Sequence, residues 1–294
     1  MPSHQRRAVF AGLTTLDVIH QVEHLPAPNA KVVALDFAVA AGGPATNAAV
    51  AFAHLGGSPE LRTRLPEHPL TGLIRADLDA CGVALVDAGG LDGPPVTASI
   101  MVTRATGERA VVSPSASAVM TNRSPVEPAS LEGASAVLVD GYYPEIAVPL
   151  ARAARAQGVP VIMDAGSLRS HTSDVIREVD VVIASQDLAT PSGAIEPDDV
   201  FAWIESLGVE RAAITRGSDP VLWRVRGAEG VVPIAPVAVV DTLGAGDFFH
   251  GALAWRIASL GMDDARLAED LAWAVAAVGP ALGSFGTRAW LGRE

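Results

Sequence analysis

The residues best suited to chemistry lie near the C-terminal end, in the run Asp241-Thr242-Leu243-Gly244-Ala245-Gly246-Asp247. The run follows the β-branched segment 237–240 and precedes apolar residues at helical spacing, which predicts a turn from a strand into a helix. Backbone N–H groups of such a glycine turn can surround an anion, and the helix start adds unpaired donors and a positive dipole end. A carboxylate beside that anion is unfavourable unless it accepts a proton from a hydroxyl that attacks phosphorus. The pattern therefore predicts phosphoryl transfer with Asp247 as the base.

A simpler interpretation of the same run is that Asp247 stabilises its own helix as a first-turn acid, next to an ordinary glycine loop. Two other phosphate-binding patterns do not fit. The glycine after Gly244 and Gly246 is Gly251, so the spacing G-x-G-x-x-G of dinucleotide-binding turns is absent. No glycine is followed by the Lys-Ser/Thr pair of a Walker A loop. The run alone thus leaves open the choice between a catalytic base and a helix-stabilising acid.

Composition narrows the classes of partner that the chain can have. Its 294 residues are 49% hydrophobic, enough to bury one large core or two modest ones. The formal net charge of −12 argues against a nucleic-acid backbone as the main partner. The longest weakly polar stretch, 271–282, is too short to cross a bilayer, and the single cysteine, Cys81, permits no intrachain disulfide. We therefore expect a cytoplasmic protein with no membrane and no nucleic-acid partner.

The order of apolar segments predicts an α/β fold in one domain that spans residues 1–294. Strands are expected at 8–13, 136–140, 159–164, 181–184 and 212–215, and helices at 145–157 and 199–207. Strand–helix–strand units of this length form right-handed crossovers, so the sheet should be parallel with helices on both faces. Another helix should begin at Pro44 after Gly42-Gly43 and end at Gly56-Gly57, with Asn47 in its first turn and off its apolar face.

The segment 96–112 has a different pattern, because apolar and polar residues alternate before a turn at Thr106-Gly107. This pattern predicts a β-hairpin with one polar face. Together with an extended run at 32–39, the hairpin would form a β lid over a ligand, built from residues 14–40 and 96–112. A meander at the edge of the main sheet is the alternative. A further hairpin is expected from Val221 to Pro236, leading into the glycine turn.

Two distant segments resemble the two signatures of the ribokinase-like (PfkB) carbohydrate kinases. They are the run 241–247 and Gly42-Gly43-Pro44-Ala45-Thr46-Asn47-Ala48-Ala49-Val50-Ala51. Within that family the likeness is to ketohexokinases and sulfofructose kinases, and segments 12–17, 22–26 and 31–34 resemble the opening of the latter. The resemblance implies a three-layer ribokinase-like fold with a mostly parallel central sheet and a small β-sheet lid. It also implies an ATP-dependent kinase that phosphorylates a primary hydroxyl of a small sugar or sugar derivative, ketohexose-like or sulfo-sugar.

The resemblance also assigns roles to residues. Asp247 would be the catalytic base, and the anion hole would be formed by the amides of Gly244, Ala245 and Gly246. The sugar would be held by Asp17, Gly42, Gly43 and Asn47, among which a carboxylate and an amide suit vicinal hydroxyls. The nucleotide would be bound by Thr215, Gly217, Thr242, Gly244, Gly246 and Gly283. Mg²⁺ would accompany ATP, held largely by phosphates and water, and Asp241 would lie beside a monovalent cation.

The chain departs from the family pattern at two places near the nucleotide. The N-x-x-E motif of many members is replaced by Ser185-Gln186-Asp187-Leu188, which is similar to the ketohexokinase version. Pro220 takes the place of the last glycine in the T-x-G-x-x-G segment that begins at Thr215. Three arginines are expected on the solvated surface or, alternatively, against an anionic substituent of the substrate: Arg104, Arg109 and Arg169.

Two other functions stay open on the sequence. A nucleoside kinase of the same family would need an aromatic-lined pocket for a base, for which Tyr142 and Tyr143 are the obvious candidates. A non-catalytic sugar-binding or regulatory protein could use the same scaffold, although the glycine turn with Asp247 argues against it. For the assembled protein we expect a homodimer through the β lid, because a small exposed sheet with an apolar face tends to be covered.

Overall fold

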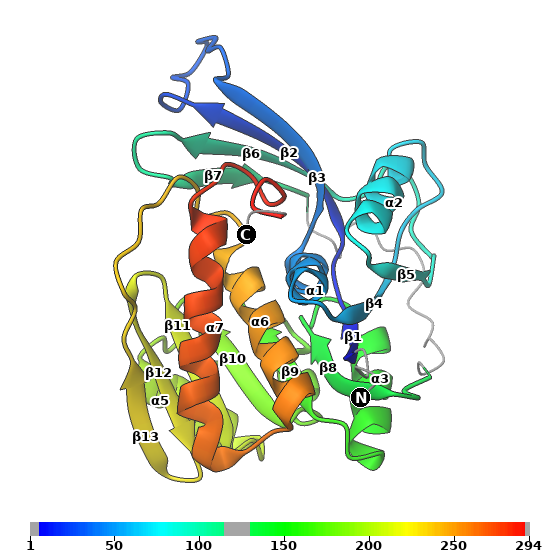
Figure 1. The fold of residues 1–294 in the computed structure, drawn as a ribbon, viewed down its shortest axis with the longest axis vertical. Coiled ribbons are helices and arrows are strands. Elements are labelled where there is room, and N and C mark those ends of the chain that lie inside the picture. Colours follow the sequence, from blue (N-terminus) through cyan, green and yellow to red (C-terminus); the bar gives the residue numbers. More distant parts are fainter. Residues whose placement is uncertain (1–5, 115–129, 292–294) are drawn as a thin grey trace.

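The computed structural model describes residues 6–114 and 130–291, which are built around one large sheet of nine strands (Figure 1). From edge to edge the strand order is β13-β12-β11-β10-β9-β8-β1-β4-β5. Neighbouring strands are parallel except for the antiparallel pairs β11–β12 and β12–β13, which confirms the predicted parallel sheet. The strands are β1 (Arg7–Ala11), β4 (Ser58–Thr63), β5 (Ala84–Asp87), β8 (Ala134–Val139), β9 (Val161–Ala165), β10 (Val181–Ser185), β11 (Arg211–Arg216), β12 (Asp219–Val225) and β13 (Ala228–Val232).

Helices cover both faces of this sheet, as predicted (Figure 1). Alternate residues of β1 point to opposite faces. Ala8 and Phe10 belong to the core with α1, α6 and α7, whereas Val9 and Ala11 belong to the core with α3, α4 and α5. A further helix, α2, lies beside β5 and the end of β3. The helices are α1 (Pro44–His54), α2 (Thr71–Ala80), α3 (Pro144–Ala156), α4 (Thr172–Ile176), α5 (Pro197–Ser206), α6 (Ala245–Leu260) and α7 (Leu267–Leu282).

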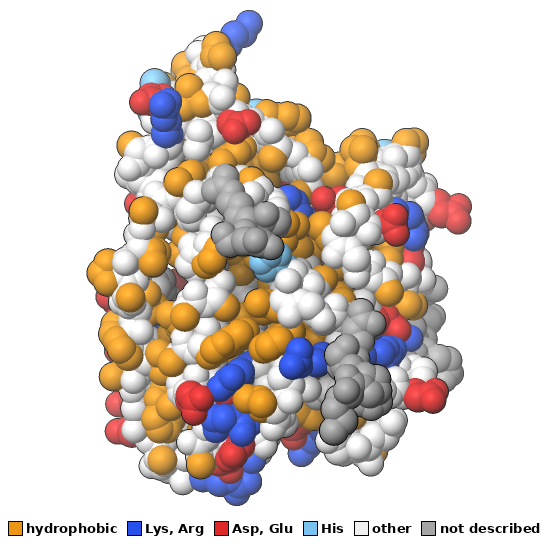
Figure 2. Space-filling view, in the orientation of Figure 1, with side chains coloured by type: hydrophobic (Ala, Val, Ile, Leu, Met, Phe, Trp, Pro, Cys, Tyr) orange, Lys and Arg blue, Asp and Glu red, His pale blue; other side chains and the backbone are white. Residues whose placement is uncertain are grey.

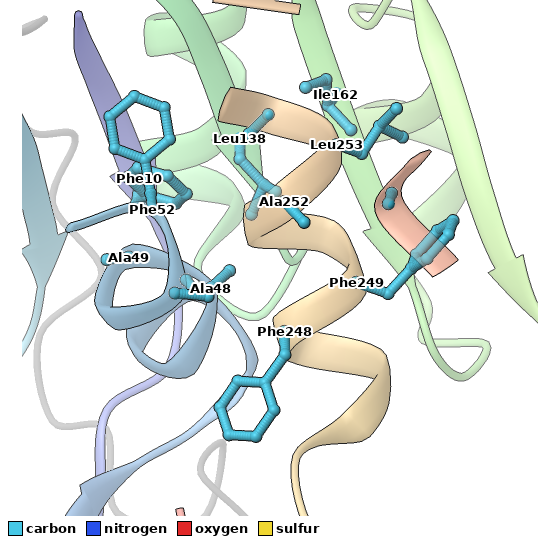
Figure 3. Packing of buried hydrophobic residues seen from close by; sticks show 14 of the residues in the cluster. Phe10, Ala48, Ala49, Phe52, Leu138, Ile162, Phe248, Phe249, Ala252 and Leu253 are labelled. Atoms are coloured by element: carbon cyan, nitrogen blue, oxygen red, sulfur yellow. The ribbon is translucent and has the colours of Figure 1, made fainter. Parts of the chain in front are cut away.

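Helices α1 and α6 pack closely against each other because small residues line their contact (Figure 3). A Cβ on Gly251 of α6 would lie 2.2 Å from the backbone oxygen of Ala48 and 2.8 Å from the Cβ of Ala51. A larger residue at 251 would therefore push the two helices apart. This close packing brings the first turn of α1, which contains Asn47, next to the first turn of α6, which contains Asp247.

A second sheet of four strands forms the lid at the top of Figure 1, in the order β3-β2-β6-β7. Its strands are β2 (Thr15–Val22), β3 (Asp36–Gly42), β6 (Thr97–Thr103) and β7 (Arg109–Val112), so the predicted hairpin is confirmed. On its inner face Ile19, Ile100 and Val102 pack on Leu243 and Phe285. The lid therefore rests on the glycine turn that precedes α6 and on the segment that follows α7.

Some predicted strand boundaries were wrong. The β-branched segment 237–240 is not a strand, because β13 ends at Val232 and the Val240 N–H donates to the Leu282 carbonyl at the end of α7 (2.7 Å). Similarly, β3 begins at Asp36, so residues 32–35 lie outside it, and β1 ends at Ala11. Within the described ranges, none of the helices is long and apolar enough to span a membrane.

Candidate active site

The site begins at the carboxyl ends of β1 and β8, which are neighbours at the centre of the large sheet. Asp140 directly follows β8, and its carboxylate accepts backbone hydrogen bonds from Leu13 (2.7 Å), Tyr142 (3.0 Å) and Ala45 (3.2 Å). A Cβ on Gly12 would lie 2.0 Å from the Asp140 carboxyl carbon, so glycine is required there. Asp140 thus ties the exit of β1 to the start of α1. In open α/β sheets, ligands bind where strand connections diverge in this way.

The turn Gly42-Gly43 joins the lid to α1 and lies against Asp17. Gly43 has a φ of 99°, and a Cβ there would lie 2.2 Å from the Leu13 backbone oxygen. A Cβ on Gly42 would lie 2.0 Å from Asp17 Oδ2, so the absence of a side chain makes room for this carboxylate. Asp17 lies within β2, not at a strand end, and Thr15 Oγ1 donates to its Oδ1 (2.6 Å). Burial raises the pKa of Asp17, while the nearby Arg288 charge lowers it.

Asn47 connects these residues to the start of α6. Its Nδ2 donates to Asp247 Oδ2 at 2.8 Å. Asn47 was expected off the apolar face of its helix, and it is nevertheless buried, because α6 covers it. The structure thus brings Asn47 and Asp247 together and places Asp17 beside the same turn that carries Asn47.

The electrostatic setting of Asp247 favours a proton on its carboxyl group. Burial, with a further contribution from the Asp164 charge, raises the pKa of Asp247 to about 7. The hydrogen bond from Asn47 and the charges of His250 and Arg109 act in the opposite direction. A carboxyl group with a pKa near neutrality is suited to accept a proton and return it.

Behind Asp247 is a buried pair, Asp164 at the end of β9 and His250 in α6. Asp164 Oδ2 lies 3.2 Å from His250 Nδ1, and the backbone of Gly246 and of Ile183 also acts on the His250 ring. Burial, followed by the Asp140 charge, raises the pKa of Asp164 to about 8, and burial lowers the pKa of His250 to about 4. Burial therefore disfavours the charged form of both groups.

The glycine turn has the geometry of an anion-binding helix start. Gly244 precedes α6 in the left-handed conformation, with a φ of 76°. Nothing lies within 4 Å of the position where Gly246 would carry a Cβ, so a ligand can approach its backbone. The Ala245 N–H donates to the Thr242 carbonyl (3.2 Å). The other N–H groups of a first helical turn have no partner within the helix, so they can bind a ligand.

A cavity of about 310 Å³ adjoins the glycine turn. Three of the predicted nucleotide residues, Thr215, Gly217 and Gly246, contribute to its wall. Gly283 ends α7 next to the wall residue Leu282 but is not itself in the wall. The rest of the wall is mostly apolar and includes Val221, Ile234, Val237, Phe249, Val275 and Leu282.

Asp241 and Thr242 connect the glycine turn to its surroundings. Asp241 Oδ1 accepts from the Leu243 N–H and Oδ2 accepts from the Gly286 N–H, each at 2.8 Å. Thr242 Oγ1 donates to the Gly107 carbonyl at the tip of the lid hairpin (3.0 Å), and Arg109 of β7 lies against the same hydroxyl (3.3 Å). The lid hairpin thus contacts the turn that carries the proposed anion hole.

The other residues singled out from sequence lie at the margin. Arg104 pairs with Glu23 at 3.5 Å on the exposed side of the lid. The Arg169 guanidinium lies 3.6 Å from the centre of the Tyr142 ring, and Tyr143 is buried. Asp187 is exposed, and its backbone N–H donates to Ser185 Oγ (3.2 Å).

Sequence reasoning missed four residues of this region: Asp140, Asp164, His250 and Arg288. A signal existed for the two aspartates, because each stands at the end of a predicted parallel strand, where sites of α/β folds form. Nothing comparable indicated His250, which sits one turn after Asp247, or Arg288, which follows the last helix. Their positions depend on how α6 and the C-terminal segment pack.

Known proteins are similar to this chain along most of its length. A family model described as "pfkB family carbohydrate kinase" matches residues 5–289 of this chain. A ribokinase of Arabidopsis thaliana is 26% identical over 271 residues, which cover 86% of this chain and 70% of that protein. Fructokinase-1 of Zea mays is 30% identical over 269 residues, which cover 81% of each chain.

Solved structures share the fold. The structure of Arabidopsis thaliana ribokinase complexed with ribose and ATP matches with a TM-score of 0.72 and 23% identity, over 99% of this chain and 100% of that one. Adenosine kinase from Sinorhizobium meliloti matches with a TM-score of 0.75 and 22% identity, over 97% and 96%. This chain therefore belongs to the PfkB family of carbohydrate kinases and has the ribokinase-like fold. It is an ATP-dependent kinase of the carbohydrate-kinase class.

Proposed function

We propose that this chain phosphorylates a primary hydroxyl of a small sugar or sugar derivative, with a ketohexose-like sugar or a sulfo-sugar as substrate. One observation carries the proposal: the partly buried Asp247 carboxylate lies in the first turn of α6, next to Asn47 and the glycine turn. In the reaction, Asp247 would accept the hydroxyl proton while the hydroxyl oxygen attacks the γ-phosphorus of ATP, the bond from that phosphorus to the bridging oxygen breaks, and ADP leaves. The pKa of Asp247, raised to about 7, suits this role.

The glycine turn would stabilise the phosphoryl group as it is transferred. Phosphoryl transfer is accelerated mainly by positioning and by stabilisation of charge on the equatorial oxygens. Backbone amides of Gly244, Ala245 and Gly246 at the positive end of α6 would supply that stabilisation. The Ala245 N–H would then exchange its bond to the Thr242 carbonyl for one to phosphate.

The sugar would lie between the lid and α1. Asp17 offers carboxylate oxygens as acceptors, and the Asn47 amide has a second N–H besides the one bonded to Asp247. The glycines at 42 and 43 keep side chains out of this space, and their backbone can approach the sugar closely. A hydroxyl held by Asp17 and Asn47 would be near the Asp247 base.

ATP would place its base in the apolar cavity next to Gly246 and its phosphates over the glycine turn. The described residues contain no group of three or more His, Cys, Asp or Glu side chains arranged to hold a metal. Because phosphates and water supply most ligands of nucleotide-bound Mg²⁺, the site fits a magnesium ion that arrives with ATP and adds charge stabilisation. The monovalent cation beside Asp241 stays a prediction.

The nucleoside-kinase alternative depends on Tyr142 and Tyr143 to line a pocket for a base, and their positions give it little support. Tyr143 is only 1% exposed and packs in the core with α3. The Tyr142 ring is covered by the Arg169 guanidinium at 3.6 Å. Tyr143 is therefore closed to a base and one face of the Tyr142 ring is occupied, which favours a sugar.

We further propose that the protein is cytoplasmic and forms a homodimer through the outer face of the lid. The apolar side chains Phe37, Val39 and Val112 are 56%, 40% and 71% exposed on this sheet, and hydrophobic side chains gather over the lid at the top of Figure 2. Exposed apolar sheet faces favour association. Sedimentation of the wild type and of Phe37→Asp tests the dimer, and a wild-type monomer at micromolar concentration would contradict it.

The substrate is tested by a coupled ADP-release assay with fructose, other ketoses, sulfofructose and adenosine, followed by phosphorus NMR of the product. Turnover with a ketose or sulfo-sugar, and a phosphate ester on a primary carbon, is expected. If adenosine is phosphorylated and none of the sugars is, the nucleoside-kinase alternative is correct. Sugar binding in calorimetry without ADP release would establish the non-catalytic alternative.

A further inference from the structure

Arg288, in the segment that follows α7, connects three distant parts of the site wall. Its Nε (3.1 Å) and Nη2 (3.0 Å) contact Asp77 Oδ2 of α2, and Nη2 also donates to the Ala41 carbonyl at the end of β3 (2.6 Å). Its Nη1 donates to Asn47 Oδ1 of α1 at 3.3 Å and to the Thr287 carbonyl at 2.9 Å. The side chain is 17% exposed, so these contacts form largely away from water.

The contact with Arg288 determines which way the Asn47 amide points. A guanidinium only donates hydrogen bonds, so the atom of Asn47 that faces it must be the oxygen. The amide nitrogen then faces Asp247 Oδ2, at 2.8 Å. A rotation of the amide by half a turn changes its shape little, so packing alone would hold this orientation only weakly.

We propose that Arg288 is a positioning residue that keeps the N–H of Asn47 directed at Asp247. This inference rests on the proposed function of Asp247 as the base. An N–H that faces the carboxylate stabilises its ionised form, which can accept a proton. An amide oxygen in that place would instead stabilise the protonated carboxyl group, which cannot accept a further proton from the sugar hydroxyl. Asp77 holds the guanidinium in position, because its Oδ2 also accepts from the Ala41 N–H at 2.9 Å.

Other groups that act on the pKa of Asp247 lie outside the segment that carries Arg288, so their effect should not depend on Arg288. They are Asp164 of β9, His250 of α6 itself and Arg109 of β7. A change in the titration of Asp247 after substitution of Arg288 therefore reports on the Asn47 amide. Arg256 offers a matched control, because it is 18% exposed and pairs with Asp270 (2.8 Å) away from this network.

The test is a carbon-13 NMR titration of the Asp247 carboxyl group in the wild type, Arg288→Met and Arg256→Met, with Asp247→Asn to identify the resonance. Loss of a charge-assisted hydrogen bond should raise the titration midpoint by about one pH unit or more in Arg288→Met. Arg256→Met should titrate as the wild type does. The acidic limb of the pH dependence of turnover should move by the same amount in Arg288→Met.

Two results would overturn the inference: an unmoved midpoint in Arg288→Met, even with a lower melting temperature, or an equal shift in Arg256→Met. Should Arg288→Met not fold, Arg288→Lys takes its place. The single ammonium group of lysine cannot reach Asp77, Ala41 and Asn47 together. The titration midpoint of Asp247 in Arg288→Lys should therefore rise by less than in Arg288→Met. An unchanged midpoint in Arg288→Lys would overturn the inference. If the midpoint shifts in Arg288→Met but Asp247→Asn keeps full turnover, the role of Asp247 as base is wrong, whereas the effect of Arg288 on Asn47 stands.

Discussion

Asn47 and Asp247 are separated by 200 positions in the chain, yet the Asn47 Nδ2 and Asp247 Oδ2 atoms are 2.8 Å apart. The bond joins the first turns of α1 and α6, and these helices can meet there because Gly251 lets α6 approach Ala48. The hydrogen bond therefore links the segment proposed to hold the sugar to the residue proposed to accept its proton.

Asp247→Asn should nearly abolish turnover while sugar and ATP still bind. The amide has the shape of the carboxylate but cannot accept the hydroxyl proton, and general-base catalysis contributes about 10²–10⁴-fold. The loss should appear in kcat rather than in KM, measured by ADP release and by calorimetry for each ligand. Near-full kcat together with a much lower melting temperature would mean that Asp247 only stabilises its helix.

Asp17→Ala and Asn47→Ala should each weaken sugar affinity with little effect on ATP affinity. Each removes one paired polar contact in an enclosed site, which costs about 1–3 kcal/mol. The measurement is the sugar KM and the calorimetric Kd, with Asp36→Ala as control, since Asp36 is an exposed aspartate at the other end of the lid. If sugar binding is unchanged in both variants, these residues are not part of the sugar site.

The rate should fall on the acidic side with a midpoint near neutrality. Burial and the Asp164 charge raise the pKa of Asp247 to about 7, and below that value Asp247 carries a proton and cannot act as a base. The pH dependence of kcat/KM reports this ionisation in the free enzyme. A midpoint near pH 4, the ordinary value of an exposed carboxyl group, would contradict the raised pKa of Asp247.

Asp164→Asn should stabilise the free protein, and more at pH 8 than at pH 5. Burial raises the pKa of Asp164 from its ordinary value of 3.8 to about 8. A group with a raised folded-state pKa contributes stability below its unfolded pKa and loses it as pH rises through the folded value. The wild type therefore loses stability between about pH 4 and pH 8 at this site, whereas asparagine does not ionise. Melting temperatures at the two pH values give the answer, and an equal gain at both would contradict the raised pKa.

Gly251→Ala should destabilise the protein strongly, by about 1–3 kcal/mol or more, because the added methyl group overlaps the Ala48 backbone oxygen. Gly279→Ala in α7 is the matched change, since nothing lies within 4 Å of its Cβ position. That variant should gain up to about 1 kcal/mol from helix propensity. Chemical denaturation gives the free energy of unfolding of each variant. If Gly251→Ala and Gly279→Ala have similar free energies of unfolding, α1 and α6 can separate without cost.

Local features of this protein were determined by the sequence itself. The helices after the two glycine turns begin as expected, and Gly43 and Gly244 adopt positive φ in those turns. The lid hairpin also follows from strict alternation around Thr106-Gly107. These features depend on backbone freedom and on side-chain periodicity, which neighbouring residues set without help from distant ones.

Tertiary structure decided what the sequence pattern could not. The β-branched segment 237–240 had the composition of a strand, but β13 already formed the sheet edge and the end of α7 took its Val240 N–H. The Asp164–His250 pair and the Arg288–Asn47 contact join residues far apart in the chain. Their pKa values and orientations depend on burial between packed elements, because desolvation and hydrogen-bond direction arise only when those elements meet.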